Sequence, residues 1–505
     1  MDIDQYQLVR FITMQKPPSR RRAASGAFLL SLLLGGCVAV PALPPKPAVR
    51  PLAAYAASAS LPGAPAGPAA ASRPAADWWR AYGDPQLTAL IEEGLAGSPD
   101  LAAAIARLEQ AQGYRQQAGA ALLPRLDGKV LAQETYAHSI PGNTIPDGAD
   151  GVGAVALQLS FDLDLWGKNR AALRAAAHDD EAAALDLAEA RLTLSTAIAS
   201  SYADLARLYA ERDVEVQAVR QRQETRDLVA QRNQTGLDTR AELKQAEAAV
   251  PAAQASLLAT DEQIALTRNA LAALLGKGPD RGLAIARPQL TASAQGLPGW
   301  ATSDVIARRP DVAAALARVQ SANERVKVAR AGFYPQVSLS GLAAHPGVTW
   351  DQLVNNGAVL AGIGPSVTLP FFHGGQIKGE YRSARAQYDA AVAAYDKSVA
   401  DAFHQLADAV TSQTMLSARL AAARQALADS ESAYAIARLR YEGGLSTYLN
   451  VLSAEDAVLS ARTAYADLAS RAFTLDIALV RAAGGGFGPA PASHTAALSK
   501  DAPHG

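Results

Sequence analysis

The chain has 505 residues, more than one small hydrophobic core requires, so its length predicts several domains or an extended shape. Its 47 Lys and Arg residues nearly balance 48 Asp and Glu residues, which argues against a nucleic-acid-binding protein, since such a protein shows a basic excess. Hydrophobic residues make up 49% of the chain, yet only 9 residues are Phe. The many alanines favour long, closely packed helices over an aromatic core.

The N-terminal segment has the pattern of a bacterial lipoprotein signal peptide. Three arginines precede the apolar stretch Ala23–Leu34, which has a signal-peptide length and is too short to span a bilayer. The sequence Leu-Gly-Gly-Cys then ends at Cys37, the only cysteine, and resembles a lipobox. We therefore predict a signal peptide over residues 1–36 and lipidation of Cys37, whose acyl chains would anchor the chain in the membrane. The alternative is a buried cysteine after an ordinary signal peptide.

The segment after Cys37 is rich in Pro, Ala and Gly, which predicts a flexible tether without a core over residues 37–76. The folded body begins at residues 77–87, DWWRAYGDPQL. The last residues, 487–505, are predicted to be a disordered tail. Both Met1 and Met14 fit as the start of the protein.

The body of the chain contains an internal repeat. SPDLAAAIARLEQA at residues 98–111 returns as RPDVAAALARVQSA at residues 309–322. Each copy has a Pro-Asp pair at a helix start, where the Asp accepts hydrogen bonds from free backbone N–H groups. The two predicted repeats cover residues 77–290 and 291–486.

Four segments alternate between apolar and polar side chains, which is the period of a strand with one apolar face and one polar face. These segments are Arg125–Tyr136, Gly153–Leu165, Pro335–Ala343 and Val359–Phe371, of which the first alternates least clearly. Loops rich in Gly, Pro and Asn connect them in pairs. The pattern therefore predicts one β-hairpin at about residues 124–165 and another at about residues 335–371.

A very long helix follows each predicted hairpin. Residues 168–235 contain no proline and no glycine, and residues 376–442 contain only Gly379. Each long helix then turns and returns through a second helix that ends at a glycine, a common helix stop. The predicted helical hairpins cover about residues 168–276 and 375–484.

Four strands cannot close a barrel, and open strand edges in lipid leave backbone groups unpaired. Three chains that pool their strands would give twelve, a feasible barrel size with a water-filled lumen. Their long helices would form a tube about 100 Å long. The predicted fold class is thus mostly α with a membrane β part: a trimeric outer-membrane channel with a twofold internal repeat, four strands per protomer in a 12-stranded barrel, and a long periplasmic α-helical barrel.

The chain resembles the outer-membrane efflux proteins, the TolC/OprM-like channels, and specifically their NodT-type lipoprotein subgroup. The matching stretches are residues 77–87, 99–111, 162–172, 305–341 and 440–456, which together span nearly everything from Asp77 to Gly484. The resemblance implies a homotrimeric exit duct in the outer membrane of a Gram-negative bacterium. A periplasmic adaptor protein and an inner-membrane transporter, usually of the RND type, would dock on it, and drugs, toxic organic compounds or dyes would pass through it.

The resemblance also implies a role for a second repeated motif, RNQTGLDTRAELKQAEA at 232–248 and RYEGGLSTYLNVLSAED at 440–456. These would be the periplasmic tips that close the duct at rest. Tyr441 matches a latch tyrosine and Glu242 the position of its acidic partner. The helix turns use Gly236, Gly443 and Gly444. Tyr441 as a simple packing residue and Glu242 as an ordinary exposed charge are the alternatives.

Side chains that would narrow the aperture follow the second turn. Leu449 matches an apolar constriction, whereas Asn450 and Ser453 stand where relatives often carry aspartate. Asp456 lies one helical turn beyond Ser453 on the same face, and it is the candidate for a negative ring, with an ordinary solvated face as the alternative. The predicted aperture residues are Glu242, Arg440, Tyr441, Leu449, Asn450, Ser453 and Asp456.

The sequence does not favour an enzyme. Its seven histidines are scattered, and it contains no HExxH and no GxSxG motif, so neither a cofactor nor a metal is expected. Two alternatives to efflux remain: a type I protein-secretion channel, and a coiled-coil envelope lipoprotein without a pore. The four alternating segments argue against the second alternative, since their apolar faces would aggregate in water.

Overall fold

The computed structural model describes residues 40–57, 59–61, 75–137, 148–289, 303–347 and 360–486. These residues form two compact units. The first unit contains Gln117–Arg174 and Asn323–Gln387, with the described residues up to Pro45, and the second contains Lys46–Gln116, Ala175–Ala322 and the chain from Tyr388 onward. Each unit therefore takes segments from both predicted repeats. Cys37, the predicted signal peptide over 1–36 and the predicted tail over 487–505 lie outside the described residues.

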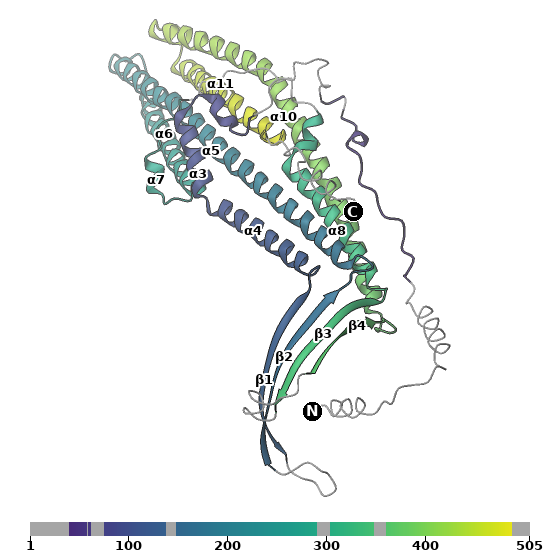
Figure 1. Ribbon diagram of the computed structural model, residues 1–505. Coiled ribbons are helices and arrows are strands. Elements are labelled where there is room, and N and C mark those ends of the chain that lie inside the picture. Colours follow the sequence, from purple (N-terminus) through teal and green to yellow (C-terminus); the bar gives the residue numbers. More distant parts are fainter. Residues whose placement is uncertain are drawn as a thin grey trace, which may run out of the picture. The chain divides into compact units, whose positions relative to one another are not determined.

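The first unit contains a four-stranded antiparallel sheet with the strand order β1-β2-β3-β4 (Figure 1). The strands are β1 (Arg125–Ala137), β2 (Gly148–Asp162), β3 (Gln336–Gly347) and β4 (Leu360–Thr368). Both predicted hairpins are confirmed, and the pairing of β2 with β3 joins them into one sheet. Pro365 lies in β4, which pairs only with β3 among the described strands, so its missing N–H is tolerated.

The register of the sheet separates apolar from polar side chains. Partners across an antiparallel pair point to the same face, so Val130↔Val155 and Val337↔Val367 each place two valines on one face. On the opposite face Ser340↔Ser160 pairs two serines. The apolar face also carries Leu126, Leu157, Leu159, Leu339 and Ile363. Several of these side chains are largely exposed, among them Leu126, Val130 and Ile363.

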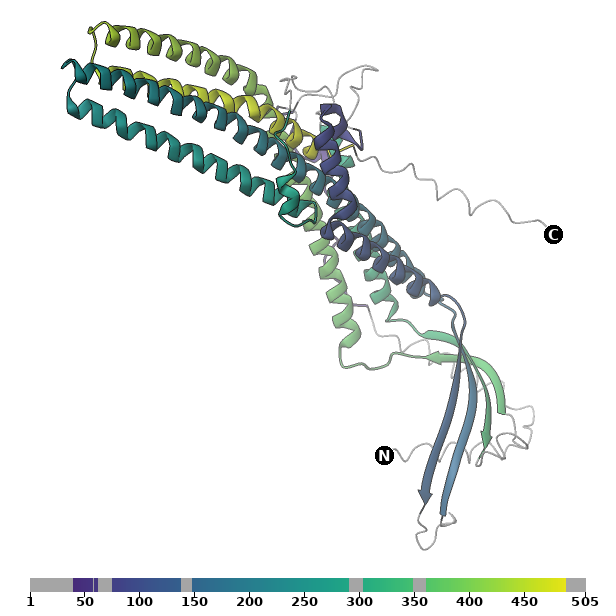
Figure 2. The ribbon, with the colours of Figure 1, turned by 90° about the vertical axis from the view of Figure 1, so that its left-hand side faces the viewer.

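The second unit is helical. The long helices of the chain are α3 (Pro85–Gly97), α4 (Pro99–Ala120), α5 (Lys168–Gln234), α6 (Arg240–Leu274), α8 (Pro310–Ala331), α10 (Gln376–Glu442) and α11 (Tyr448–Ala482). Short helices are η1 (Leu52–Ala54), η2 (Trp78–Tyr82), α7 (Asp280–Leu283) and η3 (Ser303–Arg308). The hairpin of α5 and α6 lies beside that of α10 and α11 (Figure 2). Among the described residues, no helix combines the length and apolar character that a membrane crossing requires.

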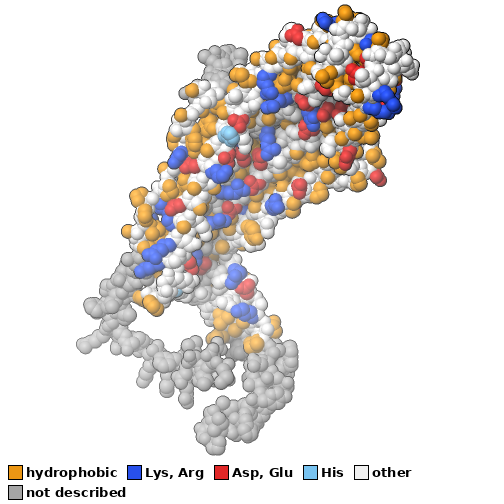
Figure 3. Space-filling model, turned by 180° about the vertical axis from the view of Figure 1, so that it is seen from behind, with side chains coloured by type: hydrophobic (Ala, Val, Ile, Leu, Met, Phe, Trp, Pro, Cys, Tyr) orange, Lys and Arg blue, Asp and Glu red, His pale blue; other side chains and the backbone are white. Residues whose placement is uncertain are grey.

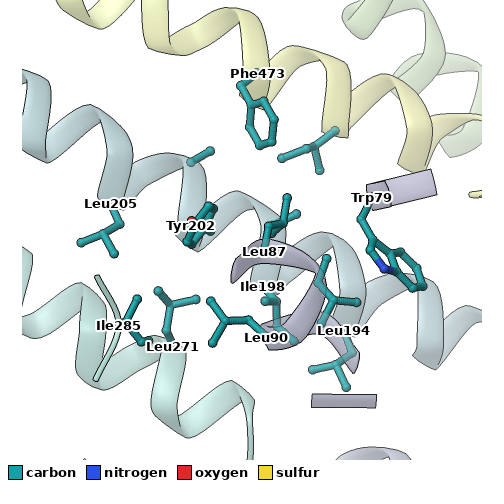
Figure 4. Close-up of a cluster of buried hydrophobic side chains, with 14 of the residues drawn as sticks. Trp79, Leu87, Leu90, Leu194, Ile198, Tyr202, Leu205, Leu271, Ile285 and Phe473 are labelled. Atoms are coloured by element: carbon teal, nitrogen blue, oxygen red, sulfur yellow. The ribbon is translucent and has the colours of Figure 1, made fainter. Parts of the chain in front are cut away.

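A buried cluster near the start of the body holds the helices together (Figure 4). Leu87 and Leu90 of α3 pack with Ile198 and Tyr202 of α5, and with Leu271 of α6. Phe473 of α11 joins the same cluster, so both helical hairpins share it. The sequence pattern did not predict α3 as a separate helix. Its start is fixed by Asp84, whose carboxylate accepts hydrogen bonds from the Gln86 and Leu87 N–H groups over 2.8 and 3.0 Å.

The Pro-rich segment before the body packs against α10. The Tyr388 hydroxyl donates to the Pro47 carbonyl over 3.1 Å, and the Tyr55 ring stacks on Phe403 with 5.4 Å between centroids. The prediction of a flexible tether over residues 37–76 is therefore corrected for this described part. An extended, proline-rich chain leaves its carbonyl groups free, and here a helix face satisfies some of them.

On the face shown in Figure 3, Lys and Arg side chains are interspersed with Asp and Glu side chains, and several such residues form ion pairs. Some of these pairs join the two helical hairpins, such as Arg438 with Glu224 at 3.2 Å. Others lie within one hairpin, such as Arg462 with Glu431 at 2.8 Å. Exposed pairs of this kind contribute little stability individually, so packing rather than charge holds the hairpins together.

Candidate gate at the helical tips

The two turns that connect the long helices to their returning helices have the same backbone geometry. Gly236 and Gly444 adopt the left-handed conformation, with φ of 79° and 74°. The next residue in each turn donates its N–H back to the helix: Leu237 to the Arg232 carbonyl over 2.8 Å, and Leu445 to the Arg440 carbonyl over 2.7 Å. This is the Schellman arrangement, which glycine permits because it has no Cβ. The predicted repetition of a helix–turn–helix is confirmed. Gly443, in contrast, keeps a negative φ.

Glu242 has a capping role in the first turn. Its carboxylate accepts a hydrogen bond from the Thr239 N–H over 2.7 Å, and its own N–H donates to the Thr239 hydroxyl over 3.3 Å. This reciprocal pair is a capping box, which begins α6. At the equivalent position in the second turn stands Asn450, whose Nδ2 donates to the Ser446 hydroxyl over 3.0 Å. The expectation that Glu242 is the acidic partner of Tyr441 is therefore corrected.

The carboxylate that Tyr441 meets is Asp238. The buried Tyr441 hydroxyl donates a hydrogen bond to Asp238 Oδ2, and Arg232 Nε lies 3.2 Å from the same oxygen. The Arg232 guanidinium also lies over the Tyr441 ring, 4.5 Å from its centroid. Burial, followed by the hydrogen bond and negative charge of Asp238, raises the pKa of Tyr441. The hydroxyl is thus held as a donor, and it ties the tip of α10 to the turn between α5 and α6.

A small apolar cluster surrounds this hydrogen bond. Tyr441 and Tyr448, with 6.3 Å between their ring centroids, pack with Val229 of α5, Ala246 of α6 and Val451 of α11. All five side chains are buried. Because the cluster takes residues from four helices, separation of the two tips would expose it to water, in addition to breaking the bond to Asp238.

A second polar cluster lies beyond the tip, between α5 and α11. Glu455 is fully buried, with Arg222 Nη1 at 3.4 Å and the Thr225 hydroxyl at 3.4 Å from the same carboxylate oxygen. Its other oxygen, Oε1, is buried without a hydrogen-bond partner among the described residues. Burial raises the pKa of Glu455 to about 7, Arg222 opposes this shift, and the negative charge of Asp456 adds to it. Neither Glu455 nor Arg222 was among the site residues predicted from the sequence.

The predicted aperture residues of α11 lie on one exposed face. Leu449, Ser453 and Asp456 follow the helical spacing of four and three residues, and Asn450 lies beside them. Leu449 is 60% exposed, and other large apolar side chains at the tips, such as Leu445, are exposed as well. Asp456 is exposed but forms an ion pair with Arg222, so its charge is partly neutralised. Arg440 is exposed at the end of α10.

Within the part of the chain that the structure describes, no three His, Cys, Asp or Glu side chains cluster closely enough to hold a metal ion. The tip polar groups instead pair with Arg232 and Arg222. The arrangement can hold two helical hairpins together and release them, because its bonds are few and its apolar contacts are local.

Comparisons with known proteins agree with this architecture. A family model described as outer membrane efflux protein matches residues 90–277 and 301–485. The chain is 35% identical over 385 residues to the fusaric acid resistance protein FusA of Burkholderia cepacia, covering 74% of this chain and 71% of that protein. It is 30% identical over 435 residues to the multidrug resistance outer membrane protein MdtP of Shigella flexneri, covering 83% and 88%.

Solved structures give the same result. The outer membrane protein VceC from Vibrio cholerae superposes with a TM-score of 0.77 at 42% identity, over 82% of this chain and 100% of that one. The outer-membrane channel OprN superposes with a TM-score of 0.77 at 28% identity, over 90% and 100%.

Proposed function

Since the chain belongs to the outer membrane efflux protein family, we propose that it is the exit duct of a tripartite efflux system. In this role it is a passive channel. It receives drugs or other toxic small molecules from an inner-membrane transporter, usually of the RND type, through a periplasmic adaptor protein, and it releases them outside. The names of the relatives, which refer to fusaric acid resistance and multidrug resistance, support small organic molecules as the cargo.

The observation that carries this proposal is the register of the sheet. It gathers apolar side chains such as Val130, Val155 and Ile363 on one face and serines such as Ser160 and Ser340 on the other. Among the described strands, β1 and β4 each pair along one side only. A sheet with an apolar face and two open edges is stable in lipid only when further strands close it. Three copies would supply twelve strands, with the polar face around a water-filled lumen.

The helical tips are the gate in this proposal. The bond from Tyr441 to Asp238 and the cluster around it hold the two hairpins of one chain together. The exposed face of α11 with Leu449, Ser453 and Asp456 would line the aperture. Docking of the adaptor would open the gate by separating the hairpins, at a cost set by one hydrogen bond, about 1 kcal/mol, and the exposed apolar area.

Cys37 is the anchor in this proposal. Its lipidation would attach the mature N-terminus to the outer membrane, on the side of the helices. The contacts of Pro47 and Tyr55 with α10 support attachment on the side of the helices, because they hold this N-terminal segment against a helix.

Two measurements test the proposed function. Chemical crosslinking of the membrane-extracted protein should give trimers, and planar-bilayer recording should give small, voltage-stable currents. A clean monomer in mild detergent would count heavily against the shared barrel. A trimer that never conducts, even after the tip bond is removed, would instead favour a structural envelope protein without a pore.

A further inference from the structure

An open pocket of about 470 Å³ lies in the first unit, lined by residues from the start of α5 and the end of α8. Figure 1 shows these two helices where they meet the strands of the sheet. Four cationic side chains line the pocket: Arg170 and Arg174 from α5, and Lys327 and Arg330 from α8. Three small residues, Gly167, Ala171 and Ala331, also line it. Nothing in the gate at the tips or in the sheet requires this concentration of positive charge.

The cations outnumber the carboxylates that they contact. Asp164 accepts from Arg170 Nε over 3.0 Å. Glu324 pairs with Arg174 at 2.9 Å and also with Lys327. Arg330 forms no ion pair with any described residue. Four cations against two carboxylates leave two positive charges in excess at one pocket.

Two aromatic rings form a rigid wall of the same pocket. Trp166 and Tyr334 stack with 4.8 Å between centroids and 22° between planes. The Trp166 indole N–H donates to the Pro335 carbonyl over 2.7 Å, which fixes the orientation of the ring. Amphipathic rings of this kind are enriched where a protein passes from lipid to water, since one part of the ring prefers each phase.

The segment that leads from β2 to Trp166 carries apolar, exposed side chains. Leu163 and Leu165 lie between the end of β2 and Trp166, and they are 43% and 60% exposed. The apolar face of the sheet therefore continues to the edge of the pocket. A ligand with hydrocarbon chains and a negatively charged head fits these two adjoining surfaces. Its hydrocarbon chains would lie on the leucines, and its head would contact the arginines.

We propose that this pocket binds the phosphate group of an anionic phospholipid at the periplasmic surface of the outer membrane. The inference rests on the proposed function, since that function places the apolar face of the sheet in lipid. Arg170, Arg174 and Arg330 supply planar guanidinium donors, which suit phosphate oxygens, and Lys327 adds a point charge. Trp166 and Tyr334 would keep the headgroup at the boundary between lipid and water. The bound lipid would fix the depth of the sheet in the membrane.

The experiment compares lipids that share acyl chains but differ in head charge. Full-length protein in mild detergent is titrated with phosphatidylglycerol or phosphatidylcholine, and native mass spectrometry counts the retained lipids. Glycerol 3-phosphate, which has the phosphate without the chains, forms a third arm. The wild-type protein should retain phosphatidylglycerol at least about fivefold more tightly than phosphatidylcholine, since each cation near an anionic headgroup contributes about that factor.

Variants identify the pocket. Arg330→Gln leaves no carboxylate without its partner, and it should lower phosphatidylglycerol affinity about fivefold. The double variant Arg330→Gln with Lys327→Gln should lose the preference over phosphatidylcholine. Arg330→Lys, which keeps the positive charge, should keep much of the phosphatidylglycerol affinity that Arg330→Gln loses. The matched control is Arg318→Gln: Arg318 lies on the same helix, and its side chain is 51% exposed, like that of Lys327, but it pairs with Asp186 and does not line the pocket. It should bind lipid like the wild type.

Three results would overturn the inference: equal retention of both lipids by the wild type, a phosphatidylglycerol preference that survives the double substitution, or binding of glycerol 3-phosphate as tight as that of the lipid. The last would assign the pocket to a soluble phosphate. Single-channel recording of the same wild-type sample separates the two proposals. A conducting protein without lipid preference refutes only the lipid site, whereas a protein that selects the lipid but never conducts refutes only the duct.

Discussion

Tyr441 at the end of α10 donates its hydroxyl hydrogen to Asp238 in the turn between α5 and α6, so one buried hydrogen bond joins the equivalent tips of the two repeats. The same Asp238 oxygen lies 3.2 Å from Arg232 Nε. Loss of Tyr441 would therefore leave the carboxylate with one charged partner. The bond can be removed without leaving an unpaired buried charge, which suits the proposed gate, in which this contact breaks on opening.

Tyr441→Phe should raise the open probability and conductance of the channel in planar bilayers. The substitution removes one hydrogen bond, about 1 kcal/mol, while the ring stays packed and Asp238 keeps Arg232. Tyr434→Phe is the matched control: Tyr434 packs against the same apolar cluster, and its hydroxyl is buried without a hydrogen-bond partner among the described residues. Equal currents from Tyr441→Phe and the wild type would contradict the proposal that the Tyr441 hydrogen bond keeps the gate closed. An equal rise in current for Tyr441→Phe and Tyr434→Phe would contradict it as well.

Glu455 should make the protein less stable as the pH rises. Its pKa is raised from 4.5 to about 7, chiefly by burial, so the folded state holds the proton more tightly than the unfolded chain does. The stabilisation that results is complete below pH 4.5 and is lost as the pH rises through 7. The full effect is on the order of 3 kcal/mol. Thermal unfolding followed by circular dichroism at pH 5 and pH 8 measures it.

Glu455→Gln should flatten this pH dependence, since the amide does not titrate. The control is Glu247→Gln at the equivalent position of the first repeat, where the side chain is 40% exposed rather than fully buried. That variant should keep the wild-type dependence on pH. Identical slopes for Glu455→Gln and the wild type would mean that other groups cause the dependence.

Gly276→Ala should destabilise the protein more than Gly236→Ala. Both glycines adopt a positive φ, 70° and 79°, so alanine is strained at each position by about 1 kcal/mol. At Gly276, a Cβ would also lie 2.6 Å from the Gly97 carbonyl oxygen and 2.8 Å from Pro99 Cδ, whereas at Gly236 it would meet open space. Comparison of the two unfolding midpoints checks this, and equal losses would show that only backbone strain matters.

Cys37→Ser should abolish incorporation of labelled palmitate and lower retention of the protein in the outer-membrane fraction. Retention should fall only in part, because the sheet is expected to hold the protein in lipid on its own. Labelling followed by membrane fractionation gives both readouts. Undiminished palmitate incorporation in the Cys37→Ser protein would show that another group carries the lipid.

Local periodicity was sufficient to predict the four strands and most of the long helices, although not α3 as a separate helix. The alternation in residues 153–165 and the absence of proline and glycine over residues 168–235 are properties of short windows, and they gave β2 and α5 within a few residues of their observed bounds. The repeated turn motif likewise predicted both Schellman turns, since Gly236 and Gly444 occupy the same place in each copy. Each of these features depends on neighbours along the chain, so the sequence determines them by itself.

Pairing between distant residues was decided only by the tertiary structure. Glu242 and Asp238 are both acidic and lie four residues apart. Glu242 accepts a hydrogen bond from the Thr239 N–H in the capping box, whereas Asp238 accepts one from the Tyr441 hydroxyl. Glu247 and Glu455 stand at equivalent positions in the two repeats, but only Glu455 is enclosed by a neighbouring helix, and its pKa is raised for that reason. A carboxylate's partner and its burial depend on which helix packs against it, and that information is not present in a short window of residues.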